Sequence, residues 1–501
     1  MSKFTSFLSK TFALGSGYAG AEQSRKRVVQ GWRRSTPKDE DKHLSSYSRD
    51  VIRCELKDLY RNNSIVKAII QRVTDNVIGN GIYIQAKTKD QKWNALAEQF
   101  FTNWSKSSDF NGRVNLHNQA RMGVTARFLD GDCGFILTKG GKVQGIESER
   151  IVSPDSKDVY EPSTQIVQGV QLDKYGVTEG YYIGNRTANG EVDNKNTVFV
   201  DAADFIFLSN PFRFDQIRGI PDLAPVVNRI RDHDELSEAT LTKAKLAAFR
   251  AFAVKRKEGR ANIPTNGNNR LANVDADYSE VPPLNKIGQM SVYHLTPEES
   301  VEDLESKTPS STYKDFDEII LREISAAIGL PYELMMMNFS TGGYASNRAA
   351  LLQSYVVFDQ WQEWIIENFY RRIWNWRIAK AIKDGTLPPA PVGDDGVSEW
   401  YKIDFTTPSR AVVDPGKEIS ANERAYLLGQ TSLTQIVREQ GRSIDDVLKE
   451  KANDIVLAIK LAAEVNKSVG KEVITFRDII TPSTPGVISN QVLPSDMNQA
   501  A

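Results

Sequence analysis

Two long helical segments that frame an irregular stretch constrain the fold of this chain more than any other feature. Residues 225–257 can form one helix of about 50 Å at 1.5 Å per residue, which is longer than most helices in globular proteins. Residues 259–310 are irregular and rich in Asn, Pro and Gly, and helicity resumes over residues 313–328. Gly329 and Pro331 then end the second helix. The pattern predicts a small module inserted between two helices.

The residues before this helical pair predict a β domain decorated with helices. Apolar residues spaced three or four apart predict helices over 47–78, with a break at Asn62 and Asn63, and over 91–104. Short strands separated by Gly and Asn turns follow, and we expect them at 135–138, 143–146, 166–172, 180–183 and 197–200.

The residues after the helical pair predict further helices and one strand. An apolar stripe with the helical period predicts a long helix over 346–383 that packs against the core. Residues after about 481 lack periodicity and are expected to be disordered. The remaining elements are a strand at 401–405 and helices at 417–429, 432–439 and 444–465. The chain as a whole is therefore predicted to be α+β.

Composition argues against several classes of protein. The 501 residues carry 63 Lys and Arg against 64 Asp and Glu, so a coat that binds nucleic acid through a basic excess is disfavoured. No apolar run approaches the roughly 20 residues that cross a bilayer, so we expect no membrane partner and a cytosol-like compartment. The two cysteines, Cys54 and Cys133, are expected to be buried reduced thiols. The four histidines lie too far apart to predict a metal site.

Catalytic motifs are weak throughout the sequence. Residues 140–142 share part of a phosphate-loop pattern, but the earlier glycine is not at the required spacing, so we interpret them as a hairpin turn. Residues 340–344 could cradle a phosphate at a helix start, yet no lysine follows them. Asp130 and Asp132 form a carboxylate pair of a kind that is common in turns. We therefore predict no catalytic residue, no cofactor and no metal.

Four stretches, in order along the chain, resemble those of one protein family. The first is DLYRNNSIVKAIIQRVTDNVIGNGI at 58–82, and the second is NPFRFDQIRGIPDLA at 210–224. The third joins an Ile-Gly-Leu-Pro turn to TGGYASNRAALL at 341–352. The fourth is DPGKEISANERAYLLGQTSLTQIVREQGRSIDDV at 414–447. Together they resemble the lambda-like portal proteins of tailed bacteriophages. The positions that match the family motifs are Arg61, Asn62, Asn63, Gly79, Gly81, Arg218, Gly219, Pro221, Arg348, Asp414, Pro415, Lys417 and Glu418.

This resemblance implies a portal fold whose parts assemble as a ring, usually of twelve subunits. The parts it implies are a wing (46–224), a first stem helix (225–257), a clip (258–312), a second stem helix (313–333), a tunnel loop (334–345), a long wing helix with a returning strand (346–417) and a helical crown (418–466). Blocks of charge before the wing predict a flexible basic N-terminal arm (1–45), and the tail (467–501) is expected to be largely disordered.

The resemblance also implies a structural function rather than an enzymatic one. The ring would sit at one capsid vertex of the virion, after assembly in the cytoplasm of the host bacterium, and DNA would pass through it during packaging and ejection. Its implied partners are further copies of itself, double-stranded DNA, the terminase that packages DNA, the major capsid and scaffolding proteins, and a head-completion or tail adaptor.

Two groups of residues are candidates for contacts in such a ring. Uncharged side chains of the tunnel loop would offer hydrogen bonds to passing DNA, and its glycines would let the backbone adjust. This group is Asn338, Ser340, Thr341, Gly342, Gly343 and Tyr344. The basic end of the first stem helix would contact a neighbouring subunit, the motor or DNA, or simply be solvated. That group is Lys255, Arg256, Lys257 and Arg260.

Two other classes of function stay open on the residues alone. One is a nucleic-acid-processing enzyme of a mobile element, which the missing metal cluster and phosphate loop disfavour. The other is a non-viral helical scaffold or adaptor, which would stay small in solution. Neither accounts for four family motifs in the same order.

Overall fold

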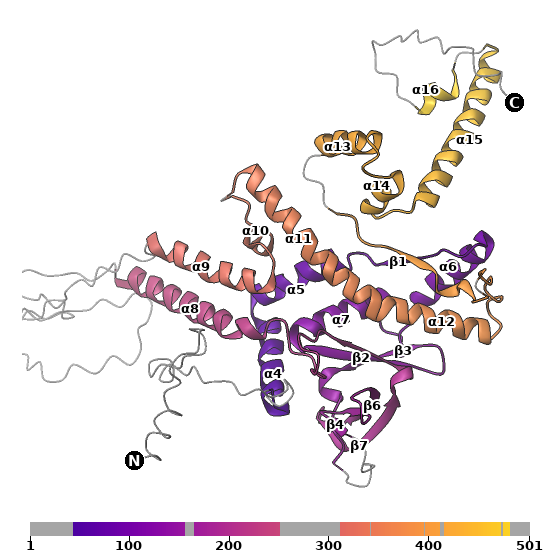
Figure 1. Ribbon diagram of the computed structural model, residues 1–501. Coiled ribbons are helices and arrows are strands. Elements are labelled where there is room, and N and C mark those ends of the chain that lie inside the picture. The colour runs from indigo at the N-terminus through magenta and orange to yellow at the C-terminus, as the bar shows by residue number, and fades with distance from the viewer. Residues whose placement is uncertain are drawn as a thin grey trace, which may run out of the picture.

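Helices and antiparallel sheets are arranged around one long helical segment that crosses the molecule (Figure 1). The computed structural model describes residues 44–155, 165–250, 311–340, 342–394, 396–410, 415–471 and 474–480. The mixture of helices and sheets confirms the predicted α+β class. Nearly all of the expected arm, and all but the end of the expected clip, lie outside the described residues. Within the described ranges, no helix is long and apolar enough to span a membrane.

The elements follow one another along the chain in this order. The helices are α4 (Ser46–Asn62), α5 (Ser64–Val77), α6 (Gln91–Ser105), α7 (Leu116–Leu129), α8 (Val227–Arg250), α9 (Ser311–Ile328), α10 (Tyr332–Met336), α11 (Tyr344–Ile365), α12 (Arg371–Lys383), α13 (Pro415–Leu427), α14 (Leu433–Glu439), α15 (Ile444–Val469) and α16 (Phe476–Ile480). The strands are β1 (Tyr83–Ala86), β2 (Asp132–Leu137), β3 (Val143–Glu147), β4 (Gln165–Val167), β5 (Val170–Leu172), β6 (Thr178–Arg186), β7 (Val192–Asp201), β8 (Phe205–Ser209) and β9 (Ile403–Thr406). Short 3-10 turns are η2 (Ser148–Arg150), η4 (Ala202–Asp204), η5 (Ala224–Val226) and η7 (Glu399–Tyr401).

The N-terminal helices agree with the sequence pattern except for one. The break between α4 and α5 falls at Asn63, whose side-chain oxygen accepts hydrogen bonds from the N–H groups of Ile65 and Val66. These bonds satisfy donors that the first turn of α5 leaves without helical partners. Helix α7 is not among the predicted elements. Its buried side chains include Gln119 and Arg127, so its apolar residues form no clear stripe.

Two small antiparallel sheets form the β domain. One has the strand order β3-β2-β8 and the other the order β4-β5-β6-β7. The hairpin turn predicted at 140–142 is confirmed, because it joins β2 to β3. The single strand predicted over 166–172 is wrong. Gln168 and Gly169 have φ of 47° and 89°, which turns the chain back on itself and splits the segment into the hairpin β4-β5.

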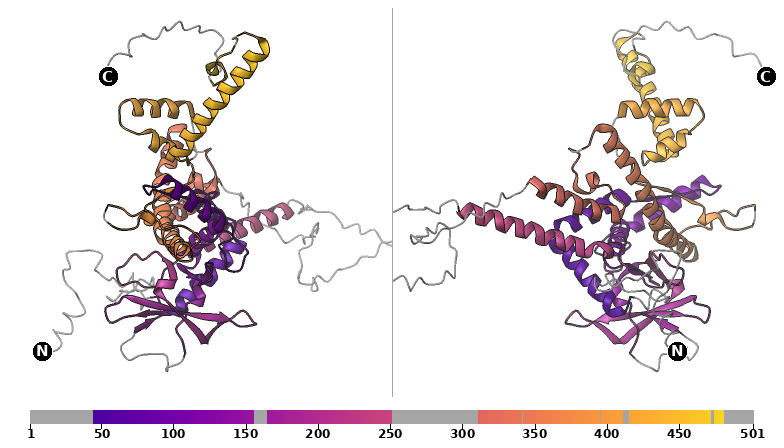
Figure 2. Two further views of the ribbon diagram at one scale, coloured as in Figure 1. Left: turned by 90° about the vertical axis from the view of Figure 1, so that its right-hand side faces the viewer. Right: turned by 60° about the vertical axis from the view of Figure 1, so that its left-hand side comes forward.

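Helices α8 and α9 lie side by side and extend away from the rest of the molecule (Figures 1 and 2). They confirm the two helices predicted on either side of the insertion. The following loop is shorter than the expected 334–345, because α10 extends to Met336 and α11 begins at Tyr344. The long helix predicted over 346–383 is present, but a π-helical segment at Ile366–Tyr370 divides it into α11 and α12.

The main core lies between this long helix, the N-terminal helices and strand β2. The Phe135 ring of β2 packs against Phe369 with ring centroids 4.7 Å apart, and Tyr370 and Trp374 are fully buried beside them. A smaller apolar cluster, with Ile183 and Phe205 among its members, lies in the β domain. Strands β1 and β9 pair antiparallel and bring the chain after α12 back to the end of α5.

The C-terminal helices α13 to α16 form a unit of their own (Figure 1). Three of them confirm the predicted helices, although α15 extends to Val469, beyond the expected start of the tail at 467. The short helix α16 also lies within that expected tail. One expectation about the cysteines is wrong: Cys133 is buried, but Cys54 is exposed on α4.

Candidate functional site

Helices α8 and α9 are held together by polar contacts along their length. Residue numbers rise along α8 where they fall along α9, so the two helices run antiparallel. The side-chain contacts are Arg229 Nε to a Glu323 oxygen at 3.2 Å, His233 Nε2 to Asp317 Oδ1 at 2.8 Å, and Ser237 Oγ to the Tyr313 hydroxyl at 3.3 Å. These pairs fix the relative register of the two helices.

The base of α8 is attached to the N-terminal helices. The Asn63 side-chain amide donates to both carboxylate oxygens of Asp234, at 2.7 and 2.8 Å. Arg231 forms an ion pair with Glu55 of α4, and the neighbouring Ile230 is fully buried in the main core. Asn63 therefore has two structural roles: it caps α5, and it binds helix α8 through Asp234.

Residues 337–343 form the loop between α10 and α11. Met337 ends α10 in the left-handed region, with φ of 53°. The Asn338 side-chain oxygen then accepts hydrogen bonds from the backbone N–H and the hydroxyl of Ser340, at 3.2 and 2.6 Å. Of the predicted tunnel-loop residues, Thr341 lies outside the described residues. Tyr344 is the first residue of α11, and its side chain is not described.

Asn347 of α11 fastens this loop from one side. Its side-chain amide donates to the carbonyls of Phe339 and Gly342, at 3.0 and 3.1 Å. A Cβ atom on Gly342 would lie 2.4 Å from the Asn347 side-chain oxygen, whereas a Cβ on Gly343 would meet no atom within 4 Å. Gly342 and Gly343, to which we assign the same role from the sequence, thus differ in their surroundings. Asn347 was not predicted, because its asparagine type alone does not reveal which carbonyls it meets.

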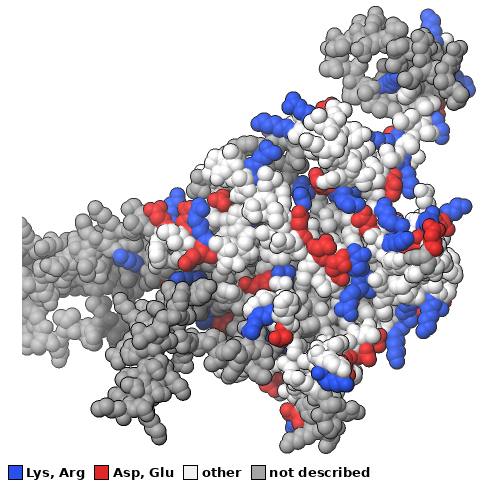
Figure 3. Space-filling view, in the orientation of Figure 1, with Lys and Arg blue, Asp and Glu red and all other residues white. Residues whose placement is uncertain are grey.

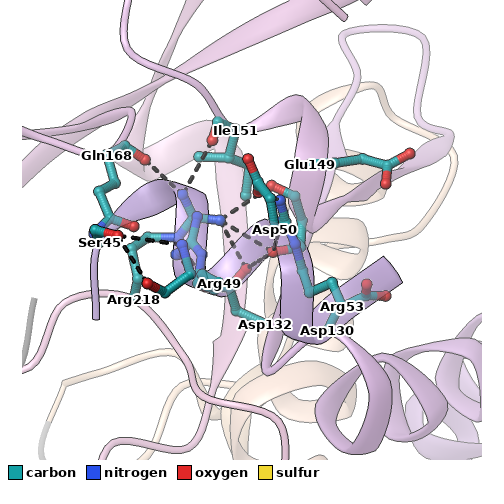
Figure 4. A network of polar contacts seen from close by, with 12 residues as sticks. Ser45, Arg49, Asp50, Arg53, Asp130, Asp132, Glu149, Ile151, Gln168 and Arg218 are labelled. Carbon is teal, nitrogen blue, oxygen red and sulfur yellow. Dashed lines mark hydrogen bonds and ion pairs between the residues drawn. The ribbon is translucent and has the colours of Figure 1, made fainter. Parts of the chain in front are cut away.

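Arg218 lies at the centre of a buried polar network in the β domain (Figure 4). Its Nε and Nη2 groups donate to the two oxygens of Asp132, at 2.7 and 2.9 Å. Its remaining N–H groups donate to the backbone carbonyls of Ile151, Gln168 and Ser148. All five donors of the guanidinium are therefore satisfied, an arrangement that the single ammonium group of lysine could not reproduce.

Two further arginines of helix α4 join this network, one at the Asp132 carboxylate and the other at Ser148. Arg49 Nη1 lies 3.8 Å from Asp132 Oδ2, and Arg53 donates to the Ser148 hydroxyl at 2.9 Å. Burial alone would raise the pKa of Asp132, but the charge and hydrogen bonds of Arg218 hold it at about 2. Burial, together with the nearby Arg218, lowers the pKa of Arg49 to about 9, so this side chain is still charged at neutral pH.

The glycine after Arg218 allows two backbone segments to touch. A Cβ on Gly219 would lie only 2.0 Å from the Gly131 carbonyl oxygen, and the Gly219 N–H donates to Asp132 at 2.9 Å. The Pro221 carbonyl then accepts a hydrogen bond from Ala224 at the start of η5, which leads into α8. This motif segment therefore anchors the start of α8 to the sheets. Asp132, which the sequence suggests only as a turn residue, is the acceptor that makes the anchor.

The glycines of the first motif end α5 where other segments come close. Gly79 and Gly81 have φ of 52° and 134°. A Cβ on Gly79 would lie 2.8 Å from the Pro408 ring, and a Cβ on Gly81 would lie 2.8 Å from the His117 ring. Only glycine fits both the backbone conformation and the space at these two positions.

The remaining predicted positions are on the surface or outside the described residues. Arg61 and Arg348 are exposed, and the Asn62 side chain donates to Asp58 at 2.8 Å. Lys417 is exposed on α13, which begins at Pro415. The side chains of Pro415 and Glu418 are not described, and Asp414 lies outside the described residues. Also outside are Lys255, Arg256, Lys257 and Arg260. The structure thus brings the first three motifs together around α5 and α8, and leaves the fourth on the C-terminal helices.

Comparison with known proteins assigns this arrangement to a family. The family model described as phage portal protein, lambda family, matches residues 25–362, which is more than half of the chain. The chain belongs to the lambda family of phage portal proteins. Members of this family are structural components of the virion.

Portal proteins of named phages are similar along most of the chain. The portal protein of Escherichia phage N15 is 21% identical over 477 residues, covering 86% of this chain and 87% of the relative. Portal protein B of Escherichia phage lambda is 21% identical over 472 residues, with the same coverage. Among solved structures, the neck of an empty gene transfer agent particle aligns with a TM-score of 0.39 and 12% identity, covering 76% of this chain and 90% of the other.

The described surface of this portal protein carries charges of both signs. Figure 3 shows Lys and Arg side chains interspersed with Asp and Glu over the face that it presents. This mixture agrees with the balance of 63 basic against 64 acidic residues in the sequence.

Proposed function

We propose that the chain assembles with further copies of itself into a closed ring, of about twelve subunits as the resemblance implies, at one vertex of the capsid. DNA passes through the centre of this ring when it is packaged and again when it is ejected. Membership of the portal family supports this assignment.

The observation that carries the proposal is the antiparallel pair α8–α9, which the short helix α10 connects to the loop at residues 337–343. We assign these two helices to the stem and residues 258–312, between them, to the clip. Residues 337–343 form the tunnel loop that faces the channel. The polar contacts from Arg229 to Tyr313 make the stem a rigid unit, and the Arg218 network fixes where it starts.

An uncharged loop suits a channel in which DNA slides. Each phosphate that a basic side chain neutralises adds affinity, and this affinity resists movement. The described residues of the loop, Met337 to Ser340 with Gly342 and Gly343, carry no charge. The loop therefore contacts DNA through weak hydrogen bonds and apolar surface rather than through ion pairs.

The partners follow from the position of each part in the ring. The clip, with the basic residues at 255–260 leading into it, is where we expect the terminase to bind during packaging and a head-completion or tail adaptor to bind later. The wing faces the major capsid protein, and scaffolding protein assists assembly in the cytoplasm of the host.

Single-particle electron microscopy of the purified chain, together with its mass in solution, tests this proposal. We expect a closed ring with a central hole wider than duplex DNA, which is about 20 Å across. A chain that stays monomeric or dimeric, even with capsid and scaffolding proteins present, would refute the proposal.

A further inference from the structure

Two helices of the C-terminal unit present apolar faces that the described part of the chain does not cover. They are α13 and α15, which lie on opposite sides of α14 (Figure 1). The buried apolar residues described in this unit, Val437, Ala458 and Ala462, belong to neither of the two apolar clusters of the molecule. The crown thus has little core of its own and leaves much apolar surface in contact with water.

Helix α13 buries none of its described side chains. Ile419 and Tyr426, seven residues apart on one face, are 65% and 50% exposed, and Leu427 beside them is also exposed. Isolated helices of this length are marginal in water, and most helices are stabilised by packing of an apolar face. Helix α13 therefore needs a partner to cover the Ile419–Tyr426 face.

Helix α15 exposes apolar side chains on more than one face, Val456, Leu457 and Leu461 among them, and one set of them forms a regular stripe. Leu448, Ala452, Ile455 and Ile459 follow one another at intervals of four, three and four residues, which is the spacing of a coiled-coil seam. The three large side chains of this stripe are each between 42% and 51% exposed. A seam of this kind is suited to packing against a second helix rather than against solvent.

The charges within the two stripes are complementary. Glu423 lies between Ile419 and Tyr426 on the face of α13, and Lys451 lies between Leu448 and Ile455 on the face of α15. Both side chains are exposed, and neither forms an ion pair within the described residues. The negative charge of Glu423 on α13 therefore has no ion-pair partner within the described residues, and Lys451 on α15 carries the positive charge that would match it.

We propose that the α15 stripe of one subunit packs against the α13 stripe of the next subunit, with Lys451 paired to Glu423. The inference rests on the proposed ring, because a ring closes through two different faces that fit each other. The chain supplies both faces and separates them by α14, so each subunit can donate one and receive the other. The occupant of the stripe is thus a second copy of this chain.

Charge exchange tests the pairing. Lys451→Glu or Glu423→Lys alone should weaken ring assembly by about tenfold or more, because like charges then meet inside an apolar contact. The double variant should restore assembly, since the pair is re-formed with its signs reversed. Lys460→Glu is the matched control: it makes the same charge change on the opposite face of α15 and should leave assembly unchanged. Equal effects of Lys460→Glu and Lys451→Glu, or no recovery in the double variant, would overturn the pairing.

Crosslinking separates this contact from the ring itself. One batch of subunits carries Tyr426→Cys and a second, differently tagged batch carries Ile455→Cys, both with Cys54→Ser. After rings assemble from the mixture, a short bis-maleimide should join the two tags, and it should join far fewer when Lys460→Cys replaces Ile455→Cys. Rings without the Tyr426–Ile455 link would overturn this contact and leave the proposed function intact. A failure to form rings with all partners present would overturn the proposed function, and this contact with it.

Discussion

Asp132 shows how much a single buried carboxylate can organise. It accepts hydrogen bonds from the Arg218 side chain, the Gly219 backbone and the Ser148 hydroxyl. Arg49 of α4 lies 3.8 Å from it, and Arg53 donates to Ser148. Breaking a buried ion pair by removing one partner is costly, because the remaining charge stays buried without compensation. The network therefore connects helix α4 to the second family motif by charge rather than by apolar packing.

Replacing Asp132 by asparagine should destabilise the folded chain by about 3–5 kcal/mol. It should also flatten the acid dependence of stability. The pKa of about 2 in the folded chain lies below the ordinary 3.8, so the carboxylate stabilises the fold above about pH 4, and this contribution is lost as the pH falls toward 2. Urea unfolding of the unassembled chain at pH 7 and pH 3 measures both effects. Asp394→Asn, which removes an exposed pair with Lys89, serves as the control and should change neither.

The neighbouring asparagines 62 and 63 offer a second comparison between single residues. Asn63→Ala removes the cap of α5 and the hydrogen bonds to Asp234, and should cost about 1–2 kcal/mol. Amide hydrogen exchange should become faster in the first turn of α5 and at the base of α8. Asn62→Ala loses only an exposed bond to Asp58 and should leave exchange at both places unchanged. Equal effects of the two changes would contradict the special position of Asn63.

At the scale of elements, the loop at residues 337–343, which we assign as the tunnel loop, contains two adjacent glycines with different surroundings. The sequence alone does not distinguish them. Gly342→Ala places a Cβ against the Asn347 side chain and should displace its clamp on the loop, while Gly343→Ala meets open space. We expect Gly342→Ala to reduce DNA packaging or genome retention in assembled particles, and Gly343→Ala to behave like the wild type. Ring formation, measured in parallel, shows whether either variant fails to assemble. Unchanged packaging and retention in both variants would show that the loop does not act on DNA in this way.

The elements that the sequence predicts well are those with a strong apolar period. Helices α4, α5 and α9 have such a period and appear within a few residues of the expected positions. Helix α8 begins two residues after its expected start, and its expected end at 257 lies outside the described residues. Helix α7 was missed because it buries polar side chains such as Gln119, which hydrogen-bonds to Asp109 and to the Val143 carbonyl. The β4-β5 hairpin was missed because a positive φ at Gln168 is not visible in an apolar run. The π-helical segment at Ile366–Tyr370 was missed because the apolar stripe of the sequence continues through it.

The sequence allowed us to select residues of the candidate site, but not to predict which residues they contact. The motifs selected Asn63, Arg218 and Gly219. Asn63 binds Asp234 of α8, and Arg218 and Gly219 anchor the segment that leads into α8. Their partners Asp132 and Asp234 come from other segments of the chain, and nothing in a single sequence pairs residues that far apart. The contribution of Asn347 depends on two backbone carbonyls, which carry no sequence signal at all.

At the scale of the whole molecule, the helices α13 to α16, which we assign to the crown, are joined to the rest of the described chain mainly by surface contacts. Exposed ion pairs link Lys87 to Asp445 at 3.3 Å and Arg438 to Asp404, and Gly441 lies close to the Ser409 backbone. Such pairs are weak and are screened by salt. The crown of an unassembled subunit should therefore behave as a separate cooperative unit.

Calorimetry of the unassembled chain should show two unfolding transitions, with the crown unfolding first. Raising the salt concentration should lower the temperature of the first transition more than that of the second, because the linking ion pairs are exposed. In assembled rings the first transition should move toward the second, since a neighbouring subunit then covers the crown. A single salt-independent transition in the isolated subunit would contradict this division of the molecule.

The two cysteines differ in exposure, so that each subunit has one thiol that a reagent can reach. Burial raises the pKa of the Cys133 thiol, so it stays protonated and out of reach, whereas Cys54 is exposed on α4. The sequence contains no other cysteine. A thiol-reactive dye applied to the native, unassembled chain should thus attach once per molecule, at Cys54. Photobleaching of rings built from such subunits would then lower the fluorescence in one step per labelled subunit. The number of steps would give the number of subunits without an image of the ring.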